Sequence, residues 1–563
     1  MLNRRLLLGT SCAVLCLVAL IAHAVPLSPA WTRQFGTSVF DGAGGVSTNG
    51  ARAYVAGSTE GTFDGETNQG LSDAFVRAYG SAGTVLWTDQ LGTAQADLGR
   101  AAAATSSGVY VAGDTGGVLP TQASAGGTDA FVSRYDPNGV PLWTRQFGTS
   151  LEERGFGVAA TPTAVYVVGH TAGTFSGEAS FGNTDAFIRK YDAQGVLVWT
   201  TQFGSGLADQ AVGVSLSGTG VYVAGHTNGA LVGQSSAGGQ DAWAARFDTS
   251  GNPVWTKQFG TPSLDAATGI AVAGNAVYVS GSTEGTMAGQ TSSGDPDAFV
   301  RRLSTSGATV WTRQFGTASS EEGRSIAATT SGAYVIGVTL SALPGETSAG
   351  SHDAFVRHYR PDGTTPWTDQ FGSSGSDTGA GVASGGAGVF AVGSVLGGAA
   401  LPGQTSAGGQ DVYLRRYVSY RPDGRIALAR SGRHAGDGVY NTTGIRQTKT
   451  VRKQQGRTQT FYLRFQNDGE ATDSFMIKGC RSGGGFRVAY LAGATGNTGI
   501  TNAVVRGNYR LNQVAPGASR SIRMKITVKA SAPDGALKTC AVRATSVAQM
   551  TRQDTVKGRV RAR

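Results

Sequence analysis

Tryptophan recurs every 56 residues over most of this chain, and this period constrains the fold more than any other feature. The seven positions are Trp31, Trp87, Trp143, Trp199, Trp255, Trp311 and Trp367. Each opens a copy of Trp-Thr-x-Gln-Phe-Gly, with Leu91 replacing Phe in the second copy. A fixed period of this length indicates one supersecondary unit whose neighbouring copies together bury a core.

Each unit carries four strand signals. In one copy, a run of small residues (155–160) precedes an apolar, β-branched run (164–169). After a Gly/Ser/Thr-rich loop, residues 185–191 alternate with period 2, and residues 196–204 hold the next Trp. Four antiparallel strands in a unit of this size predict a blade of a β-propeller. The small-residue strand suits the crowded wall near the axis, and the Trp strand is expected outermost.

The ends of the repeat region predict how a propeller would close. The first Trp strand, residues 30–36, has no preceding partner, whereas the seventh unit ends at residues 411–417 without a Trp strand. The first strand can therefore complete the last blade, which removes open sheet edges. We predict an all-β chain: a seven-bladed β-propeller of four-stranded blades over residues 25–419, followed by a small β-sandwich.

Three motifs support this prediction through a resemblance. Trp-Thr-x-Gln-Phe-Gly, Val-Tyr-Val-x-Gly and Gly-Gly-x-Asp-Ala-Phe-Val-x-Arg-Tyr resemble the bacterial seven-bladed β-propeller repeat family (SBBP-type repeats). The resemblance covers about residues 30–417. It implies an exported or surface-associated bacterial protein, and it supplies no established reaction and no catalytic residues.

The N-terminus is typical of a secretory signal peptide over residues 1–24. Arg4 and Arg5 precede an uncharged apolar run, residues 6–21, and Ala22-His23-Ala24 offers a cleavage site near Ala24. The run is shorter than the ~20 residues of a membrane span, and no later segment is apolar enough to span. We expect a secreted or cell-envelope protein without a transmembrane segment.

Cleavage would leave two of the four cysteines. Cys12 and Cys16 lie in the signal peptide, so Cys480 and Cys540 remain, and in an exported domain they predict one disulfide. Two isolated cysteines without a paired-Cys or paired-His motif cannot complete a four-ligand zinc site. We therefore expect no metal and no cofactor.

The C-terminal part differs from the repeats in pattern and charge. Residues 420–458 are basic and turn-rich, and are either a linker or the first part of a tail domain. Strand signals at 460–465, 474–478, 486–490, 521–528 and 540–545 predict a small antiparallel β-sandwich over residues 459–563. Its Phe-Gln-Asn-Asp-Gly-x-x-x-Asp-Ser-Phe and Ala-Pro-Gly-Ala-Ser segments are similar to accessory immunoglobulin-like domains at the C-termini of exported bacterial proteins.

Charge is divided unevenly along the chain. Residues 421–563 hold 26 lysines and arginines against seven acidic residues, whereas residues 1–420 hold 21 against 30. Such an asymmetry bears on partners rather than on fold. We expect the basic tail to contact an anionic surface polymer, polysaccharide or lipid. It lacks the clustered aromatics that stack on bases, so no nucleic acid is expected.

One acidic position recurs in all seven units and is the main candidate site. Its members are Asp41, Asp97, Glu153, Asp209, Asp265, Glu321 and Asp377. One interpretation is an acidic collar near the channel mouth that attracts cations or a basic partner. The favoured interpretation is that each acid caps its own turn by accepting backbone N–H bonds.

Two further positions recur with the same period. The first opens the Asp-Ala-Phe strand and is expected to anchor the preceding loop; its members are Asp73, Asp129, Asp185, Asp241, Asp297, Asp353 and Asp411. The second follows Val-Tyr-Val-x-Gly and comprises Ser58, Asp114, His170, His226, Ser282, Val338 and Ser394. Equivalent positions on neighbouring blades would be ~10 Å apart, too far for one zinc ion to bridge.

The sequence carries none of the common catalytic motifs, such as Gly-x-Ser-x-Gly, His-Glu-x-x-His or a Walker loop. The favoured function is a monomeric, non-enzymatic scaffold that binds a protein or polysaccharide on its long-loop face, where variable loops sit on a rigid framework. The alternative is a hydrolase or lyase acting on extracellular polysaccharide. Two close acids, or a carboxyl with a raised pKa, in a pocket would favour that alternative.

Overall fold

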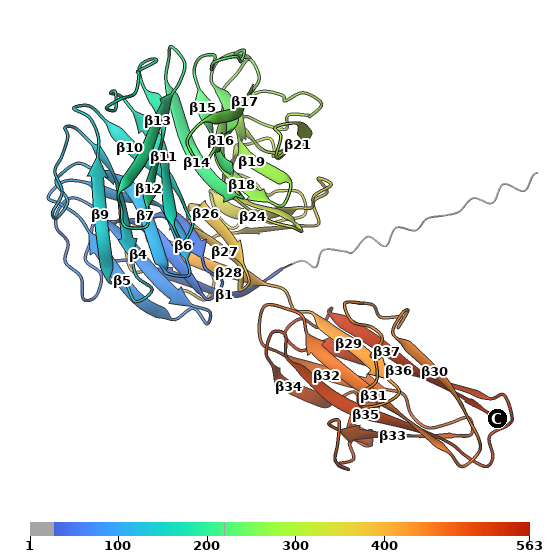
Figure 1. The fold of residues 1–563 in the computed structure, drawn as a ribbon. Coiled ribbons are helices and arrows are strands. Elements are labelled where there is room, and N and C mark those ends of the chain that lie inside the picture. The colour runs from blue at the N-terminus through green and yellow to red at the C-terminus, as the bar shows by residue number, and fades with distance from the viewer. Residues whose placement is uncertain (1–26, 219) are drawn as a thin grey trace, which may run out of the picture.

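A computed structural model describes residues 27–218 and 220–563 of the chain. The predicted signal peptide, with Cys12 and Cys16, lies outside the described residues. The described part is all-β, as predicted, with 37 strands and one short helix, α1 (Thr501–Arg506). No helix in this part is long and apolar enough to cross a membrane. Figure 1 shows one group of sheets from blue to gold and a second group, the tail (residues 420–563), in orange and red.

Residues 28–418 form seven four-stranded sheets in which strands pair antiparallel, so the predicted four-stranded units are confirmed. The first strands, rich in small residues, are β2 (Asp41–Thr48), β6 (Asp97–Thr105), β10 (Glu153–Ala160), β14 (Asp209–Ser217), β18 (Asp265–Ala273), β22 (Glu321–Thr329) and β26 (Asp377–Gly385). The second strands are β3 (Arg52–Thr59), β7 (Gly108–Thr115), β11 (Ala164–Thr171), β15 (Gly220–Thr227), β19 (Ala276–Thr283), β23 (Gly332–Thr339) and β27 (Gly388–Val395).

The outer half of each sheet consists of the Asp-Ala-Phe strand and the Trp strand. The third strands are β4 (Asp73–Gly80), β8 (Asp129–Tyr135), β12 (Asp185–Asp192), β16 (Asp241–Asp248), β20 (Asp297–Ser304), β24 (Asp353–Tyr359) and β28 (Asp411–Val418). The fourth strands are β5 (Val85–Leu91), β9 (Pro141–Phe147), β13 (Leu197–Phe203), β17 (Pro253–Phe259), β21 (Thr309–Phe315), β25 (Trp367–Phe371) and, for the last sheet, β1 (Ser28–Phe35).

The last sheet joins the two ends of the repeat region. Strand β1 pairs antiparallel with β28, with Phe35 opposite Val412. The N-terminal strand thus supplies the missing fourth strand of the seventh sheet. Each first strand also contacts the first strand of the following sheet. Strand β26 of the last sheet contacts β2 of the first sheet, so these contacts connect the seventh sheet back to the first.

Small residues on the first strands are required by this close packing. A Cβ added to Gly44 on β2 would lie 2.1 Å from the carbonyl oxygen of Gly99 on β6. Glycine allows such an approach because it has no side chain. The backbones of neighbouring sheets therefore meet where the sequence places its small-residue run.

The repeated Trp connects each fourth strand to the next sheet. Trp143 Nε1 donates to the carbonyl oxygen of Ala193, 50 residues later, at 3.1 Å. Its ring covers the turn glycine Gly195, whose φ of 78° lies in the left-handed region that favours glycine. The same indole bond, at 2.9–3.1 Å, recurs from Trp31, Trp87, Trp199, Trp255 and Trp311. The 56-residue period therefore couples each sheet to its neighbour.

The tail contains two sheets that share one hydrophobic core. The four-stranded sheet has the order β29 (Pro422–Ala427), β31 (Thr458–Asn467), β35 (Ser519–Val528) and β33 (Phe486–Ala492). The five-stranded sheet has the order β30 (Thr448–Lys453), β37 (Gln553–Ala562), β36 (Leu537–Ser546), β32 (Asp473–Gly479) and β34 (Tyr509–Val514). Strands at all five predicted tail segments are confirmed, whereas β29, β30, β34 and β37 were not predicted. The β30–β37 pair is parallel, unlike the all-antiparallel pairing expected.

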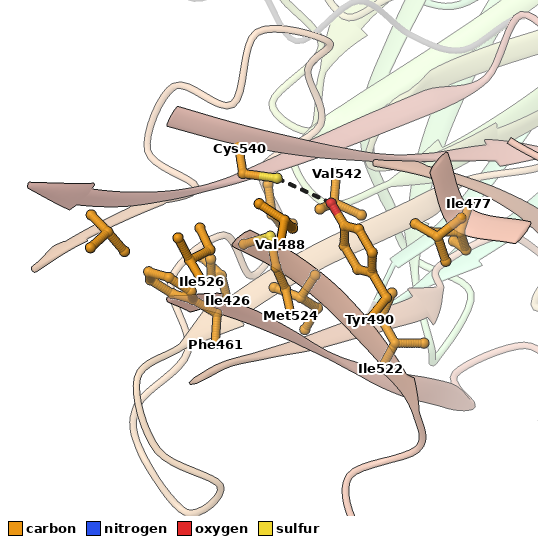
Figure 2. Packing of buried hydrophobic residues seen from close by; sticks show 14 of the residues in the cluster. Ile426, Phe461, Ile477, Val488, Tyr490, Ile522, Met524, Ile526, Cys540 and Val542 are labelled. Carbon is orange, nitrogen blue, oxygen red and sulfur yellow. Dashed lines mark hydrogen bonds between the residues drawn. The ribbon is translucent and has the colours of Figure 1, made fainter. Parts of the chain in front are cut away.

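The predicted disulfide is confirmed and lies in the tail core. Cys480 follows β32 and is bonded to Cys540 on β36, with Cα atoms 5.3 Å apart. The Tyr490 hydroxyl lies 3.1 Å from Cys540 Sγ and donates to the carbonyl oxygen of Cys480 at 3.1 Å (Figure 2). The bond links two strands of one sheet directly over the buried aromatic core.

Candidate functional site: the loop face and central cavity

Both long connections of each unit lie on one side of the sheets, here called the loop face. In the first sheet these are residues 60–72, between β3 and β4, and residues 92–96, between β5 and β6. Backbone bonds tie the two together: Asp97 N–H donates to Ser72 O at 2.7 Å, and Gly116 N–H donates to Ala96 O at 2.9 Å. The loops of neighbouring sheets therefore support one another.

The seven acids of the main candidate site hold these loops from within. Each is the first residue of a first strand and is wholly buried. Asp209, for example, accepts from the Ser205 N–H at 2.6 Å and from the Ser205 hydroxyl at 3.0 Å. The same pair of bonds, from Thr or Ser four residues earlier, recurs in the other six copies.

The interpretation of these seven acids as an exposed acidic collar is therefore wrong. The carboxylates of Asp41, Asp97, Glu153, Asp209, Asp265, Glu321 and Asp377 have no solvent-accessible surface. Their oxygens satisfy donors of the turn that would otherwise be buried without partners, which is the favoured capping interpretation. Glu fits two of the positions because its second oxygen takes the hydroxyl bond: Thr149 Oγ1 donates to Glu153 Oε1 at 2.7 Å.

The second acidic set anchors the longer loop. Asp185 Oδ2 accepts from the Phe181 N–H at 2.9 Å and from Gln202 Nε2 at 2.7 Å. Gln202 belongs to the Trp-Thr-x-Gln-Phe-Gly motif, and its Oε1 accepts from the Phe175 N–H. All seven units contain the Gln-to-Asp bond, at 2.7–2.9 Å. The Gln of the motif therefore anchors the long loop to the sheet, which explains its presence in every unit.

The two acids of one unit lie close together, with the motif glycine between them. A Cβ on Gly204 would lie 2.6 Å from Asp209 Oδ2 and 2.7 Å from Asp185 Oδ1. Burial raises the pKa of Asp209, and the charge of Asp185 raises it further. Close acids with a raised pKa are the feature that would favour an enzyme, but here both are buried in the loop framework rather than in a pocket.

A central cavity of about 640 Å³ lies where the first strands meet. Residues from all seven first strands line it, together with Phe40, Ser58, Ser394 and Gln410. Its lining, within the part of the chain that the structure describes, includes no Asp or Glu. Phe40 and Gln410 belong to loop-face connections, so the cavity reaches that face.

Every first strand carries a β-bulge, and the bulged residue lines the cavity. The pairing register shifts at this position in all seven sheets. The seven residues are Gly44, Arg100, Phe156, Val212, Thr268, Arg324 and Ala380. Bulges re-aim side chains and are frequent beside functional sites. Sequence reasoning missed these residues, although their variation within an otherwise uniform repeat was a visible signal.

One side of the cavity gathers charged and aromatic groups. The Arg100 guanidinium contacts the buried Asp114 carboxylate and lies over the Phe156 ring, 5.2 Å from its centroid. His170 packs against the same ring at 5.3 Å, and its Nε2 lies 3.5 Å from Glu152 Oε1. Burial lowers the pKa of His170. Arg100 and Phe156 thus give this side of the cavity a polar and aromatic surface, here called the cavity wall.

The third repeated set therefore divides in its roles. Asp114 and His170 contact the cavity wall without lining the cavity. His226 is half-buried, and its pKa is lowered to about 4 by desolvation and by the charge of His170. Among residues 27–218 and 220–563, no three His, Cys, Asp or Glu side chains are grouped to hold a metal ion.

No protein-family profile matches the chain. The regulatory protein FlaEY of Caulobacter vibrioides is 26% identical over 254 residues, covering 39% of this chain and 27% of that protein. The chain thus spans about a quarter of this relative. The secreted serine protease VesC of Vibrio cholerae aligns with a TM-score of 0.15 at 10% identity, covering 72% of this chain and 70% of that one. The VesB protease of Vibrio cholerae aligns with a TM-score of 0.14 at 10% identity, covering 72% and 100%.

Proposed function

We propose that residues 28–418 form a closed seven-bladed β-propeller that serves as an exported, non-enzymatic binding scaffold at the bacterial cell surface or envelope. Three observations support closure: β1 completes the sheet of β28, β26 contacts β2, and one cavity is lined by all seven first strands. The disulfide fits an oxidising compartment. The partner is a protein or polysaccharide that sits on the loop face.

The proposed binding function rests on the seven bulge residues that line the cavity. The framework positions of the repeat hardly change, because the Trp, Gln and acidic side chains each make the same contact in successive units. The bulge position instead changes from glycine to arginine, phenylalanine, valine and threonine. A symmetrical framework thereby acquires an asymmetrical lining, which is what a particular ligand requires. Arg100 and Arg324 offer donors to an acidic or polar group of the partner.

Binding to a panel of cell-envelope glycans and proteins tests this function. The full mature chain should capture a partner, and a triple variant, Arg100→Gln, Phe156→Ala and Arg324→Gln, should weaken that capture at least about tenfold. Lys257→Gln is the matched control, because Lys257 is exposed on a fourth strand outside the cavity. Equal binding by the triple variant and the control would overturn a cavity-centred site.

Enzymatic action on polysaccharide remains the competing function, because Asp114, His170 and Glu152 lie beside the cavity wall. Incubation of the mature chain with acidic polysaccharides, followed by measurement of new reducing ends, separates the two. Time-dependent chain cleavage that Asp114→Asn abolishes would replace the scaffold with a hydrolase or lyase.

A further inference from the structure

The outward face of the five-stranded tail sheet carries only basic charge. Its outward positions alternate with core residues such as Val542, Val556 and Val560. No Asp or Glu occupies an outward position on these five strands, all of which are described. The seven cations on this face, here called the basic track, are Arg452, Arg561, Arg559, Lys557, Arg543, Lys478 and Arg510.

The strand register makes the track continuous from one sheet edge to the other. Arg452 on β30 is opposite Arg561 on β37, and Arg559 and Lys557 follow at alternate positions, about 6.6 Å apart. Lys557 is opposite Ala541, so Arg543 lies diagonally across on β36. Arg543 is opposite Lys478, which lies diagonal to Arg510 on β34. Each cation thus neighbours the next.

This arrangement opposes folding. Like charges that face each other across a sheet are destabilising, and the track contains two such pairs, Arg452 with Arg561 and Lys478 with Arg543.

The other tail sheet offers a direct contrast. It has one comparable pair, Arg425 with Arg464, but there Arg425 is bound by the carboxylates of Asp423 and Asp437, each at 2.6 Å. Uncompensated repulsion on one face only indicates a surface that an external anion neutralises.

We infer that the basic track binds an acidic polysaccharide, a chain that carries carboxylate or sulfate groups along its length. The inference deepens the proposed surface role of the protein and rests on it. Five of the seven cations are arginines, whose planar forks bind carboxylate and sulfate through two parallel bonds. A linear row across a sheet suits an extended polymer, which can meet the cations one after another.

The residues between the cations favour a polymer over a membrane. Four residues between the cations have small side chains: Thr450, Thr539, Ala541 and Thr545. The longer guanidinium groups therefore extend beyond these side chains toward solvent. Proteins that bind a bilayer through a surface insert apolar side chains such as Trp, Phe and Leu below the headgroups. Among the outward positions of these five described strands, only Leu537, at the end of β36, is a large exposed apolar residue.

The test uses the full mature chain and two polymers, polygalacturonate and dextran sulfate, in 0.1 M salt. The track variant combines Arg543→Gln, Lys557→Gln, Arg559→Gln and Arg561→Gln. The matched control removes three arginines and one lysine from the outward face of the other tail sheet: Arg464→Gln, Arg487→Gln, Arg523→Gln and Lys525→Gln. Both variants change the net charge equally, and thermal unfolding verifies that each is folded.

The track variant should bind both polymers at least about tenfold more weakly than wild type, because it lacks four of the seven track cations. The control should bind within about threefold of wild type, because it keeps the whole track. Binding should also weaken as salt rises. Equal losses in both variants, or no loss in either, would overturn the assignment. Vesicles containing phosphatidylglycerol are measured alongside the polymers, and binding to these vesicles without binding to either polymer would also overturn it. The cavity variant Arg100→Gln, Phe156→Ala and Arg324→Gln should keep full polymer affinity, so failure of the cavity site remains separate from failure of the track.

Discussion

Gln34, on the first strand of the fold, donates from Nε2 to Asp411 Oδ2 at 2.7 Å, although 377 residues separate the two in sequence. Gln34 also donates to Ala399 O at 2.8 Å and accepts from the Leu401 N–H at 2.8 Å. Gln202 makes the equivalent three bonds within one continuous sheet. The junction of the chain ends therefore repeats the bonding of an ordinary unit.

This equivalence predicts equal costs for Gln34→Ala and Gln202→Ala. Each substitution leaves a buried carboxylate without one donor, which costs about 1–3 kcal/mol or more for a charged group. Chemical denaturation followed by tryptophan fluorescence should show similar losses in the free energy of unfolding. If Gln34→Ala changed nothing while Gln202→Ala was destabilising, the first strand would not complete the seventh sheet in solution.

A second prediction concerns the glycine between the two buried acids. Gly204→Ala should destabilise the protein by about 1–3 kcal/mol, because its Cβ would collide with Asp209 and Asp185 in a packed interior. Gly206→Ala is a close control: no atom lies within 4 Å of its Cβ position, and its φ is not positive. The two melting temperatures should therefore differ, with Gly206→Ala near wild type. Equal melting temperatures would show that the carboxylates can move apart freely.

The repeat could be predicted from sequence because each motif residue makes the same contacts in successive units. Trp143 reaches a turn carbonyl and Gln202 reaches a loop carboxylate, so period, spacing and residue type all indicate the same unit. The cavity residues were not readable in this way. Arg100 and Phe156 become neighbours through bulges in two different sheets, and a bulge depends on strand register rather than on composition.

The tail shows a different limit of sequence reasoning. Strand β29 begins at Pro422 and contains Gly424, two residues that usually mark turns. Strand β37 alternates Val556, Gly558 and Val560 with cations, and the glycine interrupts the apolar pattern. Gly558 leaves room for the core side chain of Met524, whose terminal methyl would lie 2.5 Å from a Cβ at this position. Core packing between the sheets, which sequence does not display, decides these strands.

The disulfide gives a third prediction. Replacing both Cys480 and Cys540 by Ser should lower the free energy of unfolding by about 4 kcal/mol, since the bond closes a 60-residue loop in the unfolded chain. Unfolding of the tail, followed by far-ultraviolet circular dichroism, measures the loss. Reduced wild-type protein should match the double variant. A stability unaffected by reduction would mean that the bond does not form in the folded protein.

Two histidines predict how the repeat region responds to acid. Burial lowers the pKa of His226 and of His358 from 6.5 to about 4. The unfolded chain therefore takes up protons at these two positions below pH 6.5, whereas the folded chain does so only near pH 4. Their contribution to stability is complete above pH 6.5 and is lost as the pH falls through that window to about 4.

Tryptophan fluorescence follows the unfolding of the seven sheets, because all eight tryptophans precede residue 420. The free energy of unfolding should fall between pH 7 and pH 5 in the wild type. His226→Gln combined with His358→Gln should flatten this dependence, even if it lowers the absolute stability, since neither glutamine titrates. A double variant with the wild-type slope would assign the acid response to other groups.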